Sequence, residues 1–240
     1  MFKRLITYYK TQQFIPGFLS IFINPFYFSR KGIYKGIREN SRFINGVLLD
    51  FGCGSKPYKH LFNIDEYIGV DIQNRGHDHS YEDIDVFYNG YELPFSDSFF
   101  NSIFSSEVFE HVFNLEEIIS ELHRVLKKGG KMLITVPFSW DEHEIPSDFC
   151  RYTSFGIKDM MEKSGFEILC FSKSSNYLEA IFQMWILYLY RVLNTGHKYL
   201  NVILNIIFVS PFTVAGIICS KLFPCRYDYY LNNIVLMKKL

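Results

Sequence analysis

The sequence predicts an α/β fold built on a mostly parallel sheet, and three features indicate it. Residues 47–50 form a short apolar run that ends in an acid and leads at once into a glycine turn, as a buried strand does when it delivers the chain to a ligand. A second such run, 67–71, follows at about the twenty-residue spacing of α/β nucleotide-binding folds. An amphipathic helical pattern over 115–126 then precedes another apolar run, 131–137. This alternation favours parallel strands covered by helices.

The first two predicted strands both end in an acid. Asp50 is followed by Gly52 and Gly54, which let the backbone approach a bound molecule closely because neither has a Cβ. Asp71 stands where such folds place a carboxylate on ribose hydroxyls. The fingerprint that binds a pyrophosphate has a third glycine where this chain has Pro57. The pattern therefore predicts a nucleoside ligand without a pyrophosphate.

Local signals predict the other elements. Pro57 begins a short helix, Asn114 caps the helix 115–126, and Gly129 and Gly130 stop it. Thr153 or Ser154 caps a later helix. The elements expected besides those already named are helices over 29–44, 56–62 and 153–164, and strands over 83–87, 103–106, 166–172 and 232–239.

The composition narrows the class of protein. The 25 basic residues balance 25 acidic ones, so the chain shows no basic surface of the kind that binds nucleic acid. The five cysteines form no CxxC pair, which indicates free thiols in a reducing cytosol. With 25 Phe and 17 Tyr, the chain has more aromatic side chains than a core needs, and this predicts an apolar surface.

Two apolar regions lie outside the predicted sheet. Residues 14–28 follow Lys3, Arg4 and Lys10, and they predict a lid or membrane-surface segment or, equally, a strap packed on the domain. Residues 177–225 contain twenty-two consecutive residues without a charge, which is long enough for a membrane span. A single crossing would separate the last strand from its partners, however.

We therefore expect the helices of residues 177–224 to lie on or dip into the membrane interface between the sixth and seventh strands. The alternative is a hydrophobic dimer or cap surface.

Five segments resemble the class I S-adenosylmethionine (AdoMet)-dependent methyltransferases, in particular a bacterial branch associated with surface-glycan and lipid-linked pathways. The resemblance covers residues 45–172 and the last strand. It implies a Rossmann-like, seven-stranded, mostly parallel sheet with an antiparallel last strand. The apolar residues 177–225 are expected, from their composition, to form a hydrophobic helical insertion between strands six and seven. The segments are DFGCGSKPY, LPFSDSFFN, SSEVFEHV, RVLKKGGKMLITVPF and WDEHEIPSDFCRYT. The expected domains are an N-terminal lid or helical segment (1–44), the AdoMet-binding core (45–176), the insertion (177–225) and the final strand (226–240).

The resemblance also implies the residues that hold AdoMet. The family commonly has an acid facing the adenine amine where this chain has Asn89, whose amide oxygen can still accept from that amine. Asp85 is the other candidate for this contact. The cofactor-binding residues expected are Asp50, Gly52, Cys53 and Gly54 at the methionine portion, Asp71 and Ile72 at the ribose, Asp85, Asn89 and Gly90 at the adenine, and Glu107 beside the methyl-transfer cleft.

The loop 138–153 is dense in titratable groups and is the expected source of the catalytic residues besides Glu107. We predict His143 as the general base, because its ordinary pKa suits removal of a hydroxyl proton; the alternative is that it only holds the loop in place. Asp148 or Glu144 would orient His143. Arg151 would bind an anionic acceptor or pair with Asp148.

The other histidines that were considered, His111, His77 and His79, are not expected to be catalytic. His111 is expected to be structural. His77 and His79 have no further ligand nearby, so no metal site is expected.

These features predict an AdoMet-dependent methyltransferase that O-methylates a hydroxyl of a sugar or lipid-linked glycan. The alternatives are a quinone, another lipid or a small molecule as acceptor, and an inactive methyltransferase-like protein that docks at a membrane. An NAD-dependent oxidoreductase shares the strand–glycine–acid layout, but Pro57 and the later motifs count against it. The expected location is the cytoplasm or the inner face of the cytoplasmic membrane. A homodimer is also considered, in which the apolar surface would contact a second copy of the chain.

Overall fold

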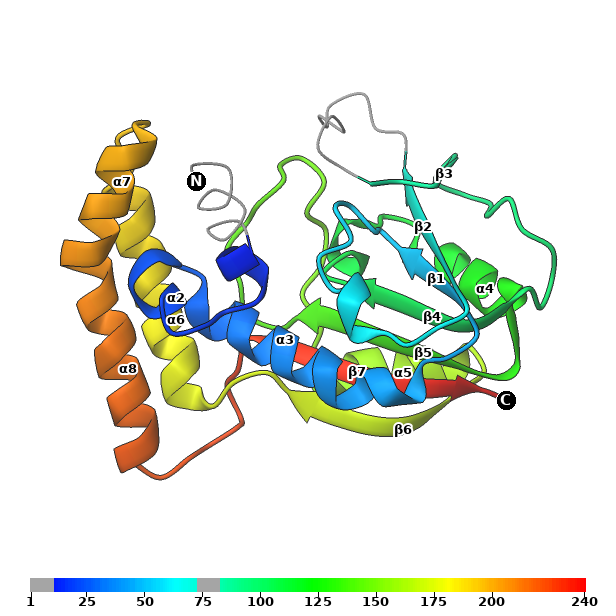
Figure 1. Cartoon of the computed structure of the whole chain (residues 1–240). Coiled ribbons are helices and arrows are strands. Elements are labelled where there is room, and N and C mark those ends of the chain that lie inside the picture. Colours follow the sequence, from blue (N-terminus) through cyan, green and yellow to red (C-terminus); the bar gives the residue numbers. More distant parts are fainter. Residues whose placement is uncertain (1–10, 73–82) are drawn as a thin grey trace. The chain divides into compact units, whose positions relative to one another are not determined.

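The computed structural model describes residues 11–72 and 83–240, and these divide into two compact units (Figure 1). A helical unit comprises residues 11–35 and 173–232, and a sheet unit comprises residues 36–172 and 233–240. The N-terminal residues thus group with the apolar insertion. The predictions made for Lys3, Arg4, Lys10, His77 and His79 lie outside the described residues.

The sheet has seven strands in the order β3-β2-β1-β4-β5-β7-β6, and the pairs β1–β2, β1–β4, β2–β3 and β4–β5 are parallel. β7 runs antiparallel to β6, since Leu240 N donates to Gly165 O at one end and Ser174 N donates to Asn232 O at the other. This confirms the predicted sheet. The strands are β1 (Val47–Phe51), β2 (Glu66–Ile72), β3 (Val86–Tyr88), β4 (Phe100–Ser106), β5 (Leu126–Pro137), β6 (Phe166–Lys173) and β7 (Asn232–Lys239).

Helices cover both faces of the sheet. Val235 and Met237 of β7 belong to the core formed with α4 and α5, whereas Ile234 points to the opposite face and contacts Gly36 of α3, as the alternation of side chains along a strand requires. A Cβ on Gly36 would lie 2.1 Å from Ile234 Cδ1, so the helix approaches the strand closely. The helical elements of this unit are the end of α3 (Tyr27–Asn40), η1 (Ser41–Phe43), η2 (Lys59–Leu61), η4 (Phe109–His111), α4 (Leu115–Val125) and α5 (Ser154–Lys163).

Three local predictions were wrong. The helix expected over 56–62 is only the short turn η2. Asn114 does not cap α4, because its amide donates to Glu117 Oε2 and to Gly90 O instead of accepting a helix N–H. The helix ends at Val125, and Gly129 lies within β5 at an irregular stretch of its pairing with β4. Thr153, by contrast, accepts from Gly156 N and caps α5 as expected.

The order of the strands positions the site. β1 lies between β2 and β4, so the chain reverses direction across the sheet at this strand. Ligands of open α/β sheets bind outside the carboxyl ends of the strands at such a reversal. The glycine turn after β1 and the acid at the end of β2 both lie there.

The helical unit is organised around buried polar contacts. Gln183 of α6 is fully buried; its side chain accepts from Phe28 N at 3.0 Å and donates to Pro25 O at 2.7 Å. Asn176 and Glu179 form a capping box at the start of α6. The helices are α2 (Ser20–Ile23), the start of α3, α6 (Tyr177–Val192), α7 (Lys198–Leu204), the π-helical η5 (Asn205–Val209) and α8 (Ser210–Leu222).

α7, η5 and α8 form one continuous apolar helix. It comprises Lys198–Leu222, has a mean hydropathy of 2.3 over its most apolar window, and by length and composition alone could cross a membrane. Only 28% of that window is buried within the structure. The exposed large apolar side chains along α6 and this helix are Tyr177, Ile181, Trp185, Tyr188, Val192, Tyr199, Leu200, Ile203, Ile206, Ile207, Phe208, Phe212, Val214, Ile218 and Leu222.

Candidate functional site

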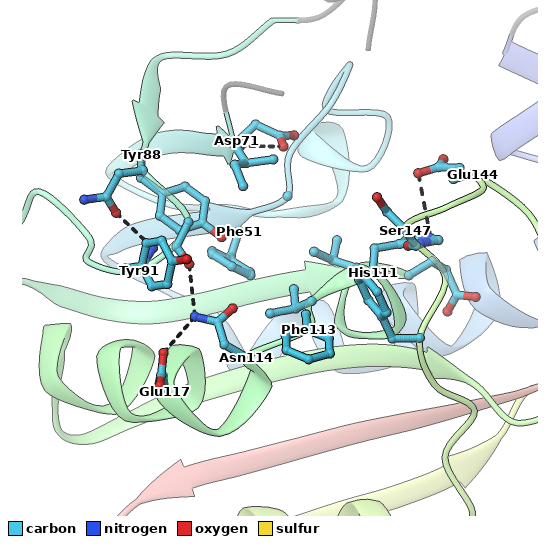
Figure 2. A pocket seen from close by; sticks show the side chains of 18 of the residues that line it. Phe51, Asp71, Tyr88, Tyr91, His111, Phe113, Asn114, Glu117, Glu144 and Ser147 are labelled. Carbon is cyan, nitrogen blue, oxygen red and sulfur yellow. Dashed lines mark hydrogen bonds and ion pairs between the residues drawn. The ribbon is translucent and has the colours of Figure 1, made fainter. Parts of the chain in front are cut away.

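A cavity of about 710 Å³ opens at the carboxyl ends of β1, β2 and β4 (Figure 2). Tyr88 and Tyr91 lie at one end of it, and His111 and Glu144 lie at the other. All the residues that line it belong to the sheet unit. They are Phe51, Gly52, Gly54, Asp71, Ile72, Tyr88, Asn89, Gly90, Tyr91, Glu107, Val108, His111, Val112, Phe113, Asn114, Glu117, Glu144, Ser147 and Phe149.

The glycine turn after β1 forms one wall of the cavity from backbone alone. Gly52 has φ +72°, and a Cβ there would lie 2.3 Å from Val108 Cγ2. Gly54 has φ +45°, and a Cβ there would meet no atom of the described residues within 4 Å. Gly52 is therefore required by packing inside the protein, whereas Gly54 leaves open the space that a ligand would enter.

Asp71 ends β2 at the cavity and is held by the backbone. Its carboxylate accepts from Gly54 N at 3.1 Å and from Ile72 N at 2.8 Å. The first contact ties the end of β2 to the glycine turn of β1. The expected residues Gly52, Gly54, Asp71 and Ile72 thus share one cavity.

Asp50 and Cys53 do not line this cavity. Asp50 is buried behind the turn, where its carboxyl accepts from the Tyr67 hydroxyl. Burial raises the pKa of Asp50 to about 7, although the Tyr67 hydrogen bond acts in the opposite direction. Burial likewise raises the pKa of the Cys53 thiol. Both side chains support the turn from beneath.

Asp85 also lies away from the cavity. It accepts from Lys56 Nζ at 2.7 Å and from Gly69 N at 2.6 Å. These hydrogen bonds outweigh the effect of burial and hold the pKa of Asp85 below its ordinary value. Lys56, whose side chain is only 3% exposed, was not singled out from the sequence. Lys56 stands between the glycine turn and Pro57, and this local sequence does not indicate that the lysine would be buried.

Asn89 lines the cavity, but its amide oxygen is already used. Asn89 Oδ1 accepts from Tyr91 N and from Glu92 N, both at 2.9 Å, and so closes the turn that follows β3. A contact between this oxygen and an adenine amine would have to replace those bonds. Gly90, in the same turn with φ +87°, lies at the cavity wall.

Glu107 follows β4 and faces the cavity in a strained conformation. Its φ is +56°, which is uncommon for a residue with a side chain. Its backbone N donates to Thr135 O at 2.9 Å, and its carboxylate accepts from Thr135 Oγ1 at 2.8 Å. Strain of this kind persists where the surrounding structure fixes it, often at functional sites.

His111, expected to be structural, is part of the cavity wall, whereas His143 is not. The two rings lie edge to face with centroids 4.7 Å apart, so His143 sits directly behind His111. His111 Nδ1 lies 2.6 Å from Ser147 O, and its Nε2 lies 3.8 Å from Glu144 Oε2.

Asp148 and Arg151 hold His143 in place. Asp148 accepts two hydrogen bonds from Arg151, at 2.5 and 2.7 Å, and one from His143 N at 3.0 Å. Its Oδ2 also lies 3.4 Å from His143 Nδ1. The Arg151 guanidinium holds the pKa of Asp148 well below its usual range. Of the two roles considered for Arg151, the structure shows the pairing with Asp148.

Glu110 was missed by the sequence analysis and is fully buried beside His111. Within residues 11–72 and 83–240, neither of its carboxylate oxygens has a hydrogen-bond donor. Burial, together with the charge of Glu107, raises the pKa of Glu110 well above its ordinary value. The motif SSEVFEHV contains this residue, but nothing in it shows that Glu110 would be buried and Glu107 exposed to the cavity.

Comparison with protein families places residues 30–170 in a model described as a methyltransferase domain. Two uncharacterized proteins of Methanocaldococcus jannaschii are similar, one 32% identical over 142 residues (58% of this chain) and the other 36% identical over 115 residues (43% of this chain). The matches cover 62% and 52% of those two proteins, so this chain spans less than two thirds of their length.

Solved structures share the fold at low sequence identity. The cyclase SpnF has a TM-score of 0.56 at 18% identity, covering 89% of this chain and 82% of that one. An S-adenosylmethionine-dependent methyltransferase of Mesorhizobium loti has a TM-score of 0.54 at 12% identity, covering 88% and 100%. Phosphoethanolamine N-methyltransferase 2 of Haemonchus contortus, solved with S-adenosylmethionine, has a TM-score of 0.50 at 18% identity, covering 85% and 52%.

Proposed function

This chain belongs to the methyltransferase-domain family, and we propose that it transfers the methyl group of AdoMet to a hydroxyl of a sugar or lipid-linked glycan. The observation that carries the proposal is the cavity bounded by the glycine turn after β1 and by Asp71 at the end of β2. The relatives do not specify the acceptor, which is argued below from the surface of the cavity.

The cavity fits the cofactor. Its volume of about 710 Å³ lies within the range of about 300–1,000 Å³ typical of small-molecule sites. Gly54 leaves open a space that a Cβ would occupy, and Asp71 presents a carboxylate at the expected ribose position. We propose that Gly52 and Gly54 hold the methionine portion and that Asp71, with Ile72, holds the ribose.

The remaining cofactor residues divide between contact and support. Asn89 and Gly90 line the cavity near Tyr88 and would bound the adenine. Asp50, Cys53 and Asp85 were also proposed as contacts, but their positions behind the turn give them a supporting role.

AdoMet, when bound, supplies a methyl group made electrophilic by the adjacent sulfonium. The protein must then exclude water, align the acceptor and remove its proton. Glu107 faces the cavity between the proposed cofactor residues and the histidines, where an acceptor hydroxyl would lie. We assign proton removal to the pair His111 and His143: His111 faces the cavity, and His143, oriented by Asp148, lies behind it.

The acceptor side of the cavity is apolar. Phe113 and Phe149 line it with ring centroids 5.4 Å apart and are 84% and 44% exposed. Exposed aromatic rings suit the apolar face of a sugar ring or a lipid chain. A quinone or another lipid hydroxyl fits the same surface.

The apolar helices favour an acceptor that is linked to lipid. We propose that α6 and the continuous helix Lys198–Leu222 contact the membrane interface, because their exposed side chains form a long apolar surface. The chain leaves the sheet after β6 and returns to it at β7, so the segment begins and ends on the same side of a bilayer.

Calorimetry with AdoMet tests the cofactor assignment. Asp71→Ala should weaken AdoMet binding at least about tenfold, a loss of about 1.4 kcal/mol, because the variant lacks the carboxylate at the ribose. Asp65→Ala, which removes an exposed acid before β2, is the matched control and should bind as the wild type does. Equal binding by both variants would overturn the assignment.

A second experiment identifies the acceptor class. Glycolipid and quinone extracts are incubated separately with AdoMet and the protein, and the products are examined by mass spectrometry. A methyl mass shift in the glycolipid arm alone supports the proposed acceptor. A shift in the quinone arm alone replaces it with the alternative.

A further inference from the structure

Three potential metal ligands meet at the end of the cavity opposite Tyr88 and Tyr91. Glu110, His111 and His143 each offer one ligand atom, and these atoms all lie within 4.8 Å of one another. Glu110 and His111 lie on the turn η4 after β4, and His143 lies in the loop between β5 and α5. A hydrogen bond of 2.8 Å from Phe149 N to Glu110 O joins the loop to the turn.

Hydrogen bonds on the far side of each ring leave the inner nitrogen free to act as a ligand. His111 Nδ1 lies 2.6 Å from Ser147 O, and a carbonyl oxygen can only accept, so Nδ1 carries the proton and Nε2 has the lone pair. His143 Nδ1 lies 3.2 Å from Asp141 O and 3.4 Å from Asp148 Oδ2, which both accept hydrogen bonds, and 3.4 Å from an Arg151 nitrogen, which donates them. The two acceptors favour the same tautomer as in His111, with the proton on Nδ1 and the lone pair on Nε2.

This arrangement is that of metal-bound histidines. Their outer nitrogen usually donates to a carboxylate or a backbone carbonyl, which fixes the ring and makes the inner nitrogen a better ligand. In this protein Ser147 O would serve His111 in that way, and Asp141 O and Asp148 would serve His143.

Glu110 provides an independent observation. Its side chain is 1% exposed, its Oε1 lies 3.7 Å from His111 Nε2, and neither oxygen accepts a hydrogen bond from the residues that the structure describes. A buried polar group without a partner is costly, and buried carboxylates are normally paired or bind metals. A cation between Glu110 and the histidines would supply the missing partner.

We propose that Glu110, His111 and His143 bind one divalent transition-metal ion of the zinc class. Two imidazoles and one carboxylate form a recurrent zinc ligand set, and three protein ligands leave a position open for another molecule. Ligand atoms about 2.0–2.1 Å from zinc lie about 3.3 Å apart, so the most separated pair must approach by about 1.5 Å. His143, which lies in a loop, can supply that movement.

His111 lines the cavity, and so does Glu144, whose Oε2 lies 3.8 Å from His111 Nε2, so the metal site borders the space assigned to the acceptor. Resting on the proposed function, the ion would hold the acceptor oxygen as a Lewis acid, beside Glu107. With the ion bound, His111 and His143 would act as ligands, and the proton of the acceptor hydroxyl would pass to the carboxylate of Glu107, which lines the cavity.

Zinc titration of the full chain after treatment with a chelator tests the site. Calorimetry should show one zinc bound per chain, and Co²⁺ should give a visible absorption band that Zn²⁺ abolishes. Glu110→Gln and His111→Gln should each weaken binding at least about 100-fold. Asp148→Asn should weaken it about 10–100-fold through His143. His60→Gln, which changes an exposed histidine on η2, is the control and should bind zinc normally.

Circular dichroism of each variant shows whether it folds, and His111→Gln, at the cavity wall, provides a test if Glu110→Gln does not. The proposal is overturned if the wild type binds no zinc saturably, or if the folded His111 variant binds it as tightly as the wild type. AdoMet calorimetry without metal separates the two proposals. AdoMet binding without zinc binding removes only the metal site, and zinc binding without AdoMet binding removes only the cofactor assignment.

Discussion

Replacing Asp50 by asparagine should change how the stability of the protein depends on pH. Asp50 is 3% exposed, and burial raises its pKa from 3.8 to about 7. The shift is about three pKa units, and at about 1.4 kcal/mol per unit the ionised carboxylate costs the folded state about 4 kcal/mol. An asparagine keeps an oxygen that can accept from the Tyr67 hydroxyl, but it does not titrate.

The sign follows from the protons bound in each state. Between pH 4 and pH 7 the folded protein keeps the Asp50 proton while the unfolded chain loses it, so the free energy of unfolding falls as the pH rises. Below pH 4 both states are protonated, and above pH 7 the cost no longer changes. From pH 5 to pH 8 the wild type should therefore lose about 2–3 kcal/mol more stability than Asp50→Asn.

Urea unfolding at pH 5, 6, 7 and 8 measures this difference directly. The asparagine amide introduces buried donors, which lower the stability of the variant by a roughly constant amount, so the slope with pH is diagnostic and the absolute value is not. Glu66→Gln, which removes an exposed carboxylate at the start of β2, should keep the wild-type slope. If the wild type and Asp50→Asn give parallel curves, Asp50 is not held in its protonated form.

Two further predictions test the packing of the turn and the apolar helix. Gly52→Ala places a Cβ 2.3 Å from Val108 Cγ2 in a residue with φ +72°. Gly54→Ala costs only the backbone strain of about 1–2 kcal/mol, so urea unfolding should show a larger loss of stability for Gly52→Ala. Equal losses of stability would contradict the close packing at Gly52. The apolar helix is tested by flotation with anionic vesicles. The wild type should rise with the lipid, whereas the double variant Ile207→Glu, Phe208→Glu should not. A wild type that stays with the soluble fraction would refute membrane contact.

The sequence predicts the strands well because buried strands contain continuous apolar runs. Residues 232–239 were predicted with the boundaries that β7 has, and the run predicted from Val47 to Asp50 lies within β1. Each run is bounded by polar residues or glycine, so local composition alone defines it. Neither prediction required knowledge of a partner strand.

The errors occur where tertiary contacts overrule a local signal. Gly129 and Gly130, after two lysines, are typical of a helix end, yet Leu126 already pairs with Phe100 of β4. Strand pairing therefore ends α4 earlier than its sequence indicates. Burial of Glu110 has the same origin, because it requires the distant Phe149 to lie over the turn η4. No spacing within the motif contains that information.

Three acids show why the cofactor site could be predicted only in part. Asp50 and Asp71 lie at the carboxyl ends of β1 and β2, Asp85 lies just before β3, and from the sequence each is a plausible ligand. Lys56 Nζ lies 2.7 Å from Asp85 and 3.5 Å from Asp83, so this buried cation is committed to acids outside the cavity.

Asp50 has no such cation as a hydrogen-bond partner, and its burial favours the protonated form. Of these three acids, Asp71 is the one that reaches the cavity, where backbone N–H groups hold its carboxylate. Aspartates near neighbouring strands thus acquire different roles through burial and partners. A further acid at such a position can be assigned to a ligand only after its partners are known.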